Sequence, residues 1–185
     1  MNYHNIQYDD MLNGMGLRVT LFVSGCNNYC AGCQNPQTWD INSGIPFTSA
    51  DFDELCSRLD HPYIRGLTLS GGDPLYEPNV HIVTDICKRV KERFPDKDIW
   101  MYTGRLWGAV CDYSIMQYLD VLIDGPFEQA LLSPDAHWVG SSNQRIIDVQ
   151  KSLAAGKVVL WSEVPGQISI EEYMSEVQHE NNKND

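Results

Sequence analysis

The sequence predicts an α/β fold built around a mostly parallel sheet, and two observations carry that prediction. Short segments rich in β-branched and aromatic residues alternate with segments whose apolar residues recur at helical spacing. The chain, at 185 residues, is also long enough to bury one sizeable core. Because right-handed crossovers curl a parallel sheet, this alternation suits either an open doubly wound sheet or an incomplete β/α barrel.

The first half of the chain predicts one strand–helix–strand unit. A strand is expected at residues 17–23, where the run LRVTLFV is rich in β-branched and aromatic side chains. A helix is expected over residues 48–59, since Thr48 and Asp51 have the spacing of a capping box at a helix start. The apolar residues 66–69 are expected to form the second strand.

The second half continues the alternation. Residues 79–94 carry apolar side chains at helical spacing and end before Pro95, which predicts an amphipathic helix. Short apolar strands are expected at residues 99–102 and 121–123. Two weaker strand candidates, residues 145–149 and 157–161, flank a candidate helix at residues 150–155.

Charge and hydropathy disfavour several classes of protein. The formal net charge of −12 disfavours binding to the phosphate backbone of a nucleic acid. No apolar run reaches the roughly 20 residues of a membrane-spanning helix, and the polar residues 1–10 do not resemble a secretory signal. We therefore expect a cytoplasmic protein without a membrane or nucleic-acid partner. Residues 1–160 are expected to form one domain, followed by an acidic, flexible tail over residues 161–185.

Three of the six cysteines fall within eight residues, as Cys26, Cys30 and Cys33. Glycine and asparagine within this segment oppose a helix, so the cysteines are expected in a loop that leaves the first strand. A cytoplasmic setting disfavours disulfides, which favours a metal centre. Elsewhere, Cys56 and Cys87 lie on apolar helix faces and are expected to be buried, while the pattern around Cys111 assigns it no role.

The number of clustered cysteines separates the candidate metals. A structural zinc ion takes four ligands, and a 4Fe–4S cluster is normally held by four thiolates. A group of three leaves one iron without a protein ligand, and a chelating small molecule can take that place. A zinc-binding interaction module, completed by Cys56 or a histidine, is the alternative from another class, and a plain electron carrier is a third.

Residues 70–74 (SGGDP) follow the second expected strand as the cysteines follow the first. Taken alone, this segment is typical of a tight turn. Because the carboxyl ends of parallel strands meet at one edge of a sheet, both segments are expected on the same rim. Two glycines let backbone carbonyls approach an ammonium group, and Asp73 adds a negative charge.

The C-x3-C-x2-C spacing resembles the signature of the radical S-adenosylmethionine superfamily, and Gly71-Gly72-Asp73 resembles its glycine-glycine-acid motif. This resemblance implies an incomplete, laterally open (β/α) barrel. It also implies one 4Fe–4S cluster on the three cysteines, with S-adenosyl-L-methionine chelating the fourth iron. For Thr103 and Asp124, at two strand ends, an ordinary turn role is the alternative. The residues implied to bind S-adenosyl-L-methionine are Gly32, Cys33, Gln34, Gly71, Gly72, Asp73, Thr103 and Asp124.

Four further segments resemble activases of glycyl-radical enzymes, and in particular the activating proteins of anaerobic ribonucleoside-triphosphate reductases. The resemblance covers about residues 1–150. It implies reductive cleavage of S-adenosylmethionine and formation of a glycyl radical on the large anaerobic reductase subunit, with an external, flavodoxin-like one-electron donor. An activase of another glycyl-radical enzyme, such as pyruvate formate-lyase, is the alternative. The four segments are residues 13–18 (NGMGLR), 33–40 (CQNPQTWD), 120–127 (DVLIDGPF) and 140–145 (GSSNQR).

Overall fold

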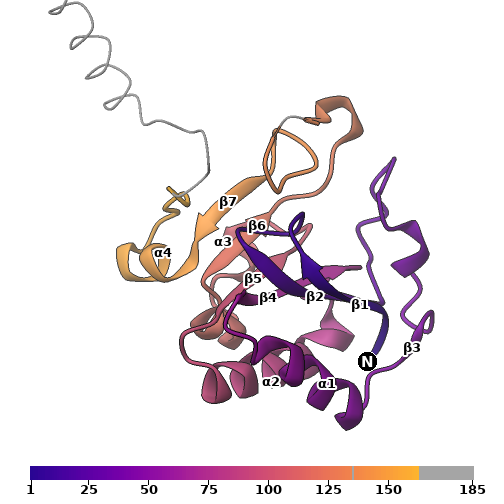
Figure 1. The fold of residues 1–185 in the computed structure, drawn as a ribbon. Helices are drawn as coiled ribbons and strands as arrows, with labels where there is room; N and C mark the ends of the chain where they lie inside the picture. The colour runs from indigo at the N-terminus through magenta and orange to yellow at the C-terminus, as the bar shows by residue number, and fades with distance from the viewer. Residues whose placement is uncertain (135, 163–185) are drawn as a thin grey trace, which may run out of the picture.

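The structure is a computed structural model that describes residues 1–134 and 136–162. Within these residues, seven strands form one mixed sheet in the order β3-β1-β2-β4-β5-β6-β7 (Figure 1). Strands β2, β4, β5 and β6 pair in parallel, while β1, β3 and β7 are antiparallel additions at the two edges. The strands are β1 Asn2–Asp10, β2 Leu17–Val23, β3 Ile45–Pro46, β4 Ile64–Gly71, β5 Asp98–Tyr102, β6 Val121–Asp124 and β7 Arg145–Asp148.

Two helices cover one face of the sheet, at the bottom of Figure 1. The guanidinium of Arg89 on α2 lies 3.6 Å from the ring centroid of Phe52 on α1, so the two helices are in contact. Alternate residues of the parallel strands, such as Leu21 and Leu69, are fully buried in the main apolar core that these helices share. The helices are α1 Ser49–Leu59, α2 Glu77–Arg93, α3 Trp107–Val110 and α4 Val149–Ala155, with 3₁₀ turns η1 Pro36–Thr38, η2 Ser114–Tyr118 and η3 Gln129–Leu131.

On the opposite, inner face of the sheet, strands β2 and β4 carry buried polar side chains. Arg18 on β2 is fully buried there, and its Nη1 lies 2.6 Å from Asp98 Oδ1. Its Nε donates a hydrogen bond of 2.7 Å to Thr68 Oγ1, and its guanidinium lies 5.1 Å from the ring of Trp100. Thr68 in turn donates to the backbone oxygen of Asn13. These contacts hold the loop that enters β2 across the inner face.

The structure confirms a mixed α/β sheet with a parallel centre. Among the described residues the two edge strands, β3 and β7, do not pair with each other, so the sheet is open. No helix in the described part of the chain combines the length and apolar character needed to cross a membrane. The expected tail over residues 161–185 lies outside the described residues, apart from its first two.

Most expected elements are confirmed, and the differences lie at their ends. Strand β2 has the predicted bounds, whereas β4 is longer than residues 66–69 and α2 starts two residues before residue 79. The prediction of a strand at residues 157–161 is wrong. The backbone nitrogen of Val159 donates to Ser152 Oγ of α4 over 2.8 Å, so it is not available for a strand ladder. The segment makes one isolated bridge, between Leu160 and Ile147.

The predicted capping box of α1 is confirmed. Asp51 accepts a hydrogen bond of 2.7 Å from the backbone nitrogen of Thr48, and Thr48 Oγ1 accepts one from the backbone nitrogen of Asp51. The Thr48 side chain holds the pKa of the Asp51 carboxyl below its ordinary value.

We expect Thr48→Ala to lower the free energy of unfolding by about 1 kcal/mol at neutral pH, as for other lost N-caps. A carboxyl whose pKa is lowered by folding stabilises the folded state at pH values above its ordinary pKa of about 4. This stabilisation is lost as the pH falls below that value. The difference between variant and parent should therefore shrink toward about pH 3. Denaturant unfolding at both pH values measures it, and an equal difference at both would contradict the role of Asp51.

Candidate functional site

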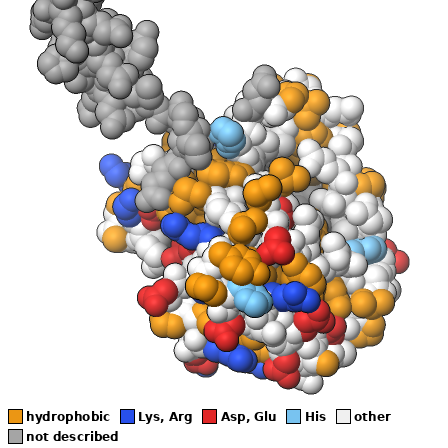
Figure 2. Space-filling view, in the orientation of Figure 1, with side chains coloured by type: hydrophobic (Ala, Val, Ile, Leu, Met, Phe, Trp, Pro, Cys, Tyr) orange, Lys and Arg blue, Asp and Glu red, His pale blue; other side chains and the backbone are white. Residues whose placement is uncertain are grey.

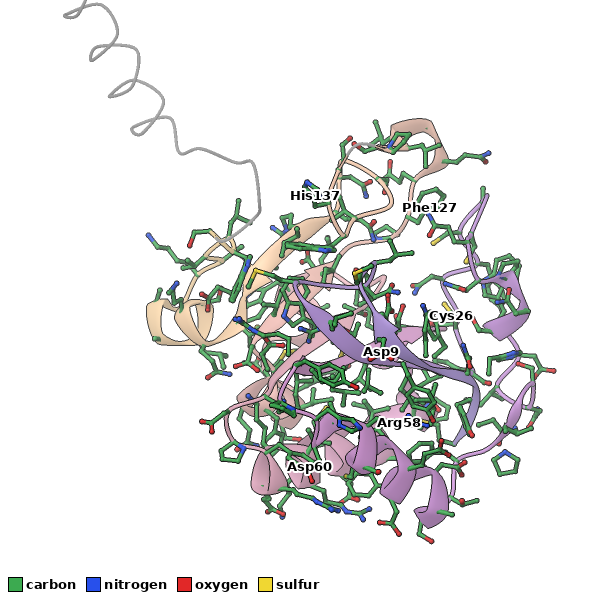
Figure 3. All side chains as sticks on the ribbon, viewed as in Figure 1. Asp9, Cys26, Arg58, Asp60, Phe127 and His137 are labelled. Atoms are coloured by element: carbon green, nitrogen blue, oxygen red, sulfur yellow. The ribbon has the colours of Figure 1, made fainter. Side chains whose placement is uncertain are left out.

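A cavity opens at the carboxyl ends of the parallel strands. Cys26 comes from the loop after β2 and Phe127 from the segment after β6, and both line it (Figure 3). The expected rim of the sheet therefore carries a real cavity, which brings together residues that are far apart in the sequence. The cavity is lined by Asn13, Cys26, Asn28, Cys30, Cys33, Gln34, Asn35, Trp39, Ser70, Gly71, Gly72, Tyr102, Thr103, Gly104, Gly125, Phe127, Gly140 and Gln144.

The cysteine loop is closed at its base by backbone hydrogen bonds. The nitrogen of Gly25 donates to the oxygen of Thr38 over 2.7 Å, and that of Cys26 donates to the oxygen of Trp39 over 3.0 Å. Thr38 is buried, and the rings of Tyr29 and Trp39 meet edge to face with centroids 5.3 Å apart. The segment that follows the third cysteine therefore returns to the start of the loop and fixes its shape.

The three clustered cysteines are half-buried, reduced and directed at one cavity. The backbone nitrogen and Nδ2 of Asn28 lie 3.5 and 3.4 Å from Cys26 Sγ, and the backbone nitrogen of Asn35 lies 3.3 Å from Cys33 Sγ. Burial raises the pKa of the Cys26 thiol, and the hydrogen bonds from Asn28 act against that rise. A bound metal would favour the thiolate, which these donors also stabilise.

The donor set suits a cluster better than a single ion. Among the described residues, no three cysteine, histidine or carboxylate side chains converge as ligands of one metal ion. A structural zinc ion takes four ligands, whereas three thiolates can hold three of the four irons of a 4Fe–4S cluster. Trp39 also lines the cavity, and within the described residues its buried indole nitrogen has no hydrogen-bond partner.

Gly71 and Gly72 continue the pairing of β4 with β2 into the site. The nitrogen of Gly72 donates to the oxygen of Val23, and the nitrogen of Asp73 donates to the oxygen of Gly25, both over 2.8 Å. Gly71 has a φ of +98°, which favours glycine. A Cβ added at Gly72 would lie 2.4 Å from the oxygen of Gly25. The two glycines thus let the two loops touch through their backbones.

Asp73 lies beneath the cavity and does not line it. Its side chain is buried, and the carboxylate accepts hydrogen bonds from Thr103 Oγ1 at 2.9 and 3.1 Å and from Asn28 Nδ2 at 3.0 Å. The backbone nitrogens of Leu75 and Gly104 donate to it as well, at 2.9 and 3.3 Å. One carboxylate therefore joins the cysteine loop to the ends of β4 and β5.

The other sequence-predicted residues divide into two groups. Gln34 and Thr103 line the cavity, whereas Gly32 and Asp124 do not. Gly32 is exposed and faces the side chain of Gln129. Asp124 is fully buried, and its carboxylate accepts a hydrogen bond from the backbone nitrogen of Trp107 and pairs with Arg145.

The cavity residue Asn28 was not singled out from the sequence, and Phe127 and Gln144 stood there only as members of the segments that resemble activases. Gln144 lies in the segment GSSNQR, where its Oε1 accepts hydrogen bonds from the nitrogens of Gly140 and Ser141 and its Nε2 donates to the oxygen of Gly125. These bonds hold the segment against the end of β6. The position of Asn28 between the first two cysteines was the signal that could have marked it.

A second cavity of about 500 Å³ continues the first along the inner face of the sheet. The two share Asn13, Gln34, Asn35, Tyr102 and Gly140, so they form one groove. Among the described residues, the only titratable side chains that line the second cavity are those of Tyr102 and His137. Its remaining lining residues are Met11, Leu12, Phe22, Ala136, His137, Trp138 and Val139.

Comparisons with known proteins give a consistent answer. The family model described as "4Fe-4S single cluster domain" matches residues 12–147. The anaerobic ribonucleoside-triphosphate reductase-activating protein of Enterobacteria phage T4 is 45% identical over 146 residues, which cover 79% of this chain and 93% of the relative. Its namesake in Vibrio cholerae serotype O1 is 44% identical over 150 residues (79% and 97%), and that in Escherichia coli strain K12 is 43% identical over 148 residues (78% and 96%).

Proposed function

Because this chain belongs to the family of anaerobic ribonucleoside-triphosphate reductase-activating proteins and carries a 4Fe-4S single cluster domain, we propose that it is a radical S-adenosylmethionine activase that places a glycyl radical on the large reductase subunit. When bound and reduced by one electron, the cluster supplies the electron that splits S-adenosyl-L-methionine into methionine and a 5′-deoxyadenosyl radical, which takes a hydrogen atom from a glycine Cα. The protein's own residues bind, orient and shield these groups.

One observation carries the proposal. Cys26, Cys30 and Cys33 lie in one closed loop and line the same cavity as Gly71 and Gly72. Within the described residues, none of the other three cysteines lines that cavity. Cys56 and Cys87 are buried in the apolar core, and Cys111 packs against the edge of that core. Three thiolates would hold three irons and leave the fourth to a small-molecule ligand.

The neighbouring residues supply polar groups for that ligand. Cys33, Gln34, Gly71, Gly72 and Thr103 line the cavity, so we propose that they contact S-adenosyl-L-methionine directly. The Gln34 amide can both donate and accept, and the glycines expose backbone groups. Three members of the expected set, Gly32, Asp73 and Asp124, would act through neighbours, with the Asp73 carboxylate making the floor of the cavity attractive to an ammonium group.

We further propose that the open sheet is an incomplete (β/α) barrel over residues 1–160, and that the reductase segment bearing the target glycine closes its side. On the face seen in Figure 2, charged side chains gather mainly over α1 and α2, and the upper part shows mostly hydrophobic and uncharged side chains. Met11 and Leu12, at the second cavity, are 70% and 77% exposed. An uncharged groove with an apolar rim suits a neutral peptide segment.

Several further expectations complete the proposal. The electron would come from an external, flavodoxin-like donor, and the protein would act in the cytoplasm. Excluding water from the cavity while the partner segment is bound would protect the reacting groups from side reactions. The proposed activity requires neither a nucleic acid nor a membrane as a partner.

The proposal is tested by mixing the anaerobically reconstituted protein with the large reductase subunit, S-adenosyl-L-methionine and a reductant. We expect a glycyl radical signal by electron paramagnetic resonance, as a doublet from the remaining Cα hydrogen that collapses when the glycine is deuterated at Cα. Pyruvate formate-lyase in place of the reductase is the matched control, and we expect no signal from it. A signal with that partner alone would move the activase to the other enzyme, and stoichiometric zinc without sulfide in the anaerobically purified protein would exclude the activase altogether.

A further inference from the structure

Asn28 joins three parts of the site that are distant in the sequence. Its Nδ2 lies 3.4 Å from Cys26 Sγ and 3.0 Å from Asp73 Oδ2. The amide also packs against Gly104, at the end of β5, where an added Cβ would lie 2.2 Å from Nδ2. Asn28 is thus held between the cysteine loop and the ends of β4 and β5.

The partners of Asn28 fix which way its amide points. A thiolate at Cys26 and a carboxylate at Asp73 both accept hydrogen bonds and donate none, so only the NH₂ end of the amide can face them. The two hydrogens of Nδ2 can serve one partner each. Asp73 is itself held by Thr103 and by two backbone nitrogens, so it acts as a rigid anchor for the amide.

We propose that Asn28 is a positioning residue that raises the reduction potential of the cluster held by Cys26, Cys30 and Cys33, by donating its side-chain N–H to the sulfur of Cys26. The inference rests on the proposed function and concerns how this chain tunes that site. Hydrogen bonds to cluster sulfurs stabilise the reduced, more negative state, and the potential falls when they are removed. The negative charge of Asp73 nearby makes the intervening donor more important.

The chain offers two independent ways to remove this bond. Asn28→Ala deletes the donor. Gly104→Ala keeps Asn28 but places a methyl group where the amide lies, and the backbone of Gly104 is not in a conformation that requires glycine. Asn27→Ala is the matched control, because Asn27 is the same residue type in the same loop, exposed and outside the cavity lining.

The test is a redox titration of the reconstituted proteins without S-adenosyl-L-methionine, in which the paramagnetic signal of the reduced cluster is followed against the applied potential. We expect the midpoint potentials of Asn28→Ala and Gly104→Ala to shift to more negative values, and that of Asn27→Ala to match the parent. The double variant Asn28→Ala/Gly104→Ala should match Asn28→Ala, because the methyl group then has no amide to displace.

An unchanged midpoint in Asn28→Ala, or shifts that add in the double variant, would overturn the inference. If Asn28→Ala retains no cluster, Gly104→Ala decides alone: a negative shift supports the inference and an unchanged midpoint overturns it. A parent protein that takes up no cluster would instead refute the proposed function, so the two failures are distinguishable.

Discussion

Replacing Cys26, Cys30 or Cys33 by alanine, one at a time, should abolish reductive cleavage of S-adenosyl-L-methionine. Each thiolate would hold a different iron, so no remaining cysteine of the loop can take over the lost bond. Loss of a neighbour that merely orients a metal ligand costs about 10- to 100-fold in affinity or activity, and loss of a ligand should cost more than about 100-fold. Anaerobic reconstitution followed by assays of iron, sulfide and 5′-deoxyadenosine measures the effect.

Cys111→Ala is the control for these variants. Cys111 is half-buried at the end of α3, packs against the core and does not line the cavity. We expect the iron content and the cleavage rate of the Cys111→Ala variant to equal those of the parent. Cleavage that persists in one of the three loop variants would remove that cysteine from the ligand set, and a loss in Cys111→Ala would show that the loop is not the whole centre.

The parallel centre of the fold could be predicted because its strands are short runs rich in β-branched and aromatic residues, bounded by turn residues. Strand β2 was found with its full bounds, and so was the capping box of α1. Strand β1 was missed, because its sequence NYHNIQYDD is polar and alternates weakly. It forms through pairing along β2, and pairing with a distant segment leaves little local signal.

The residues that line the cavity were predictable where they lie in short sequence motifs. The three cysteines lie within eight residues, and the two glycines are adjacent to each other. Both groups follow strands that end at the same edge of the sheet, and both line one cavity. The buried position of Asp73, where it joins three segments, was not predictable. Its partners Thr103 and Asn28 come close to it only when the sheet forms. The ion pair between Asp124 and Arg145, which joins the antiparallel strands β6 and β7, was not predictable either.

Gly72→Ala should destabilise the protein by about 2–3 kcal/mol, in the range for overpacked sites. The new Cβ would lie 2.4 Å from the oxygen and 2.9 Å from the carbon of Gly25. Both are backbone atoms of the loop that leads to Cys26, so no side chain can move aside to relieve the contact. The strand ends would have to separate, which would lengthen the bond from the Asp73 nitrogen to the Gly25 oxygen.

Gly108→Ala separates this contact from a general effect of replacing glycine. Gly108 lies exposed in α3, and a Cβ added there meets nothing within 4 Å. Alanine is favoured over glycine in a helix by up to about 1 kcal/mol, so Gly108→Ala should be neutral or stabilising. Denaturant unfolding of the metal-free proteins compares the two. If both variants unfold like the parent, the backbone contact between the cysteine loop and the glycine turn does not hold the site together.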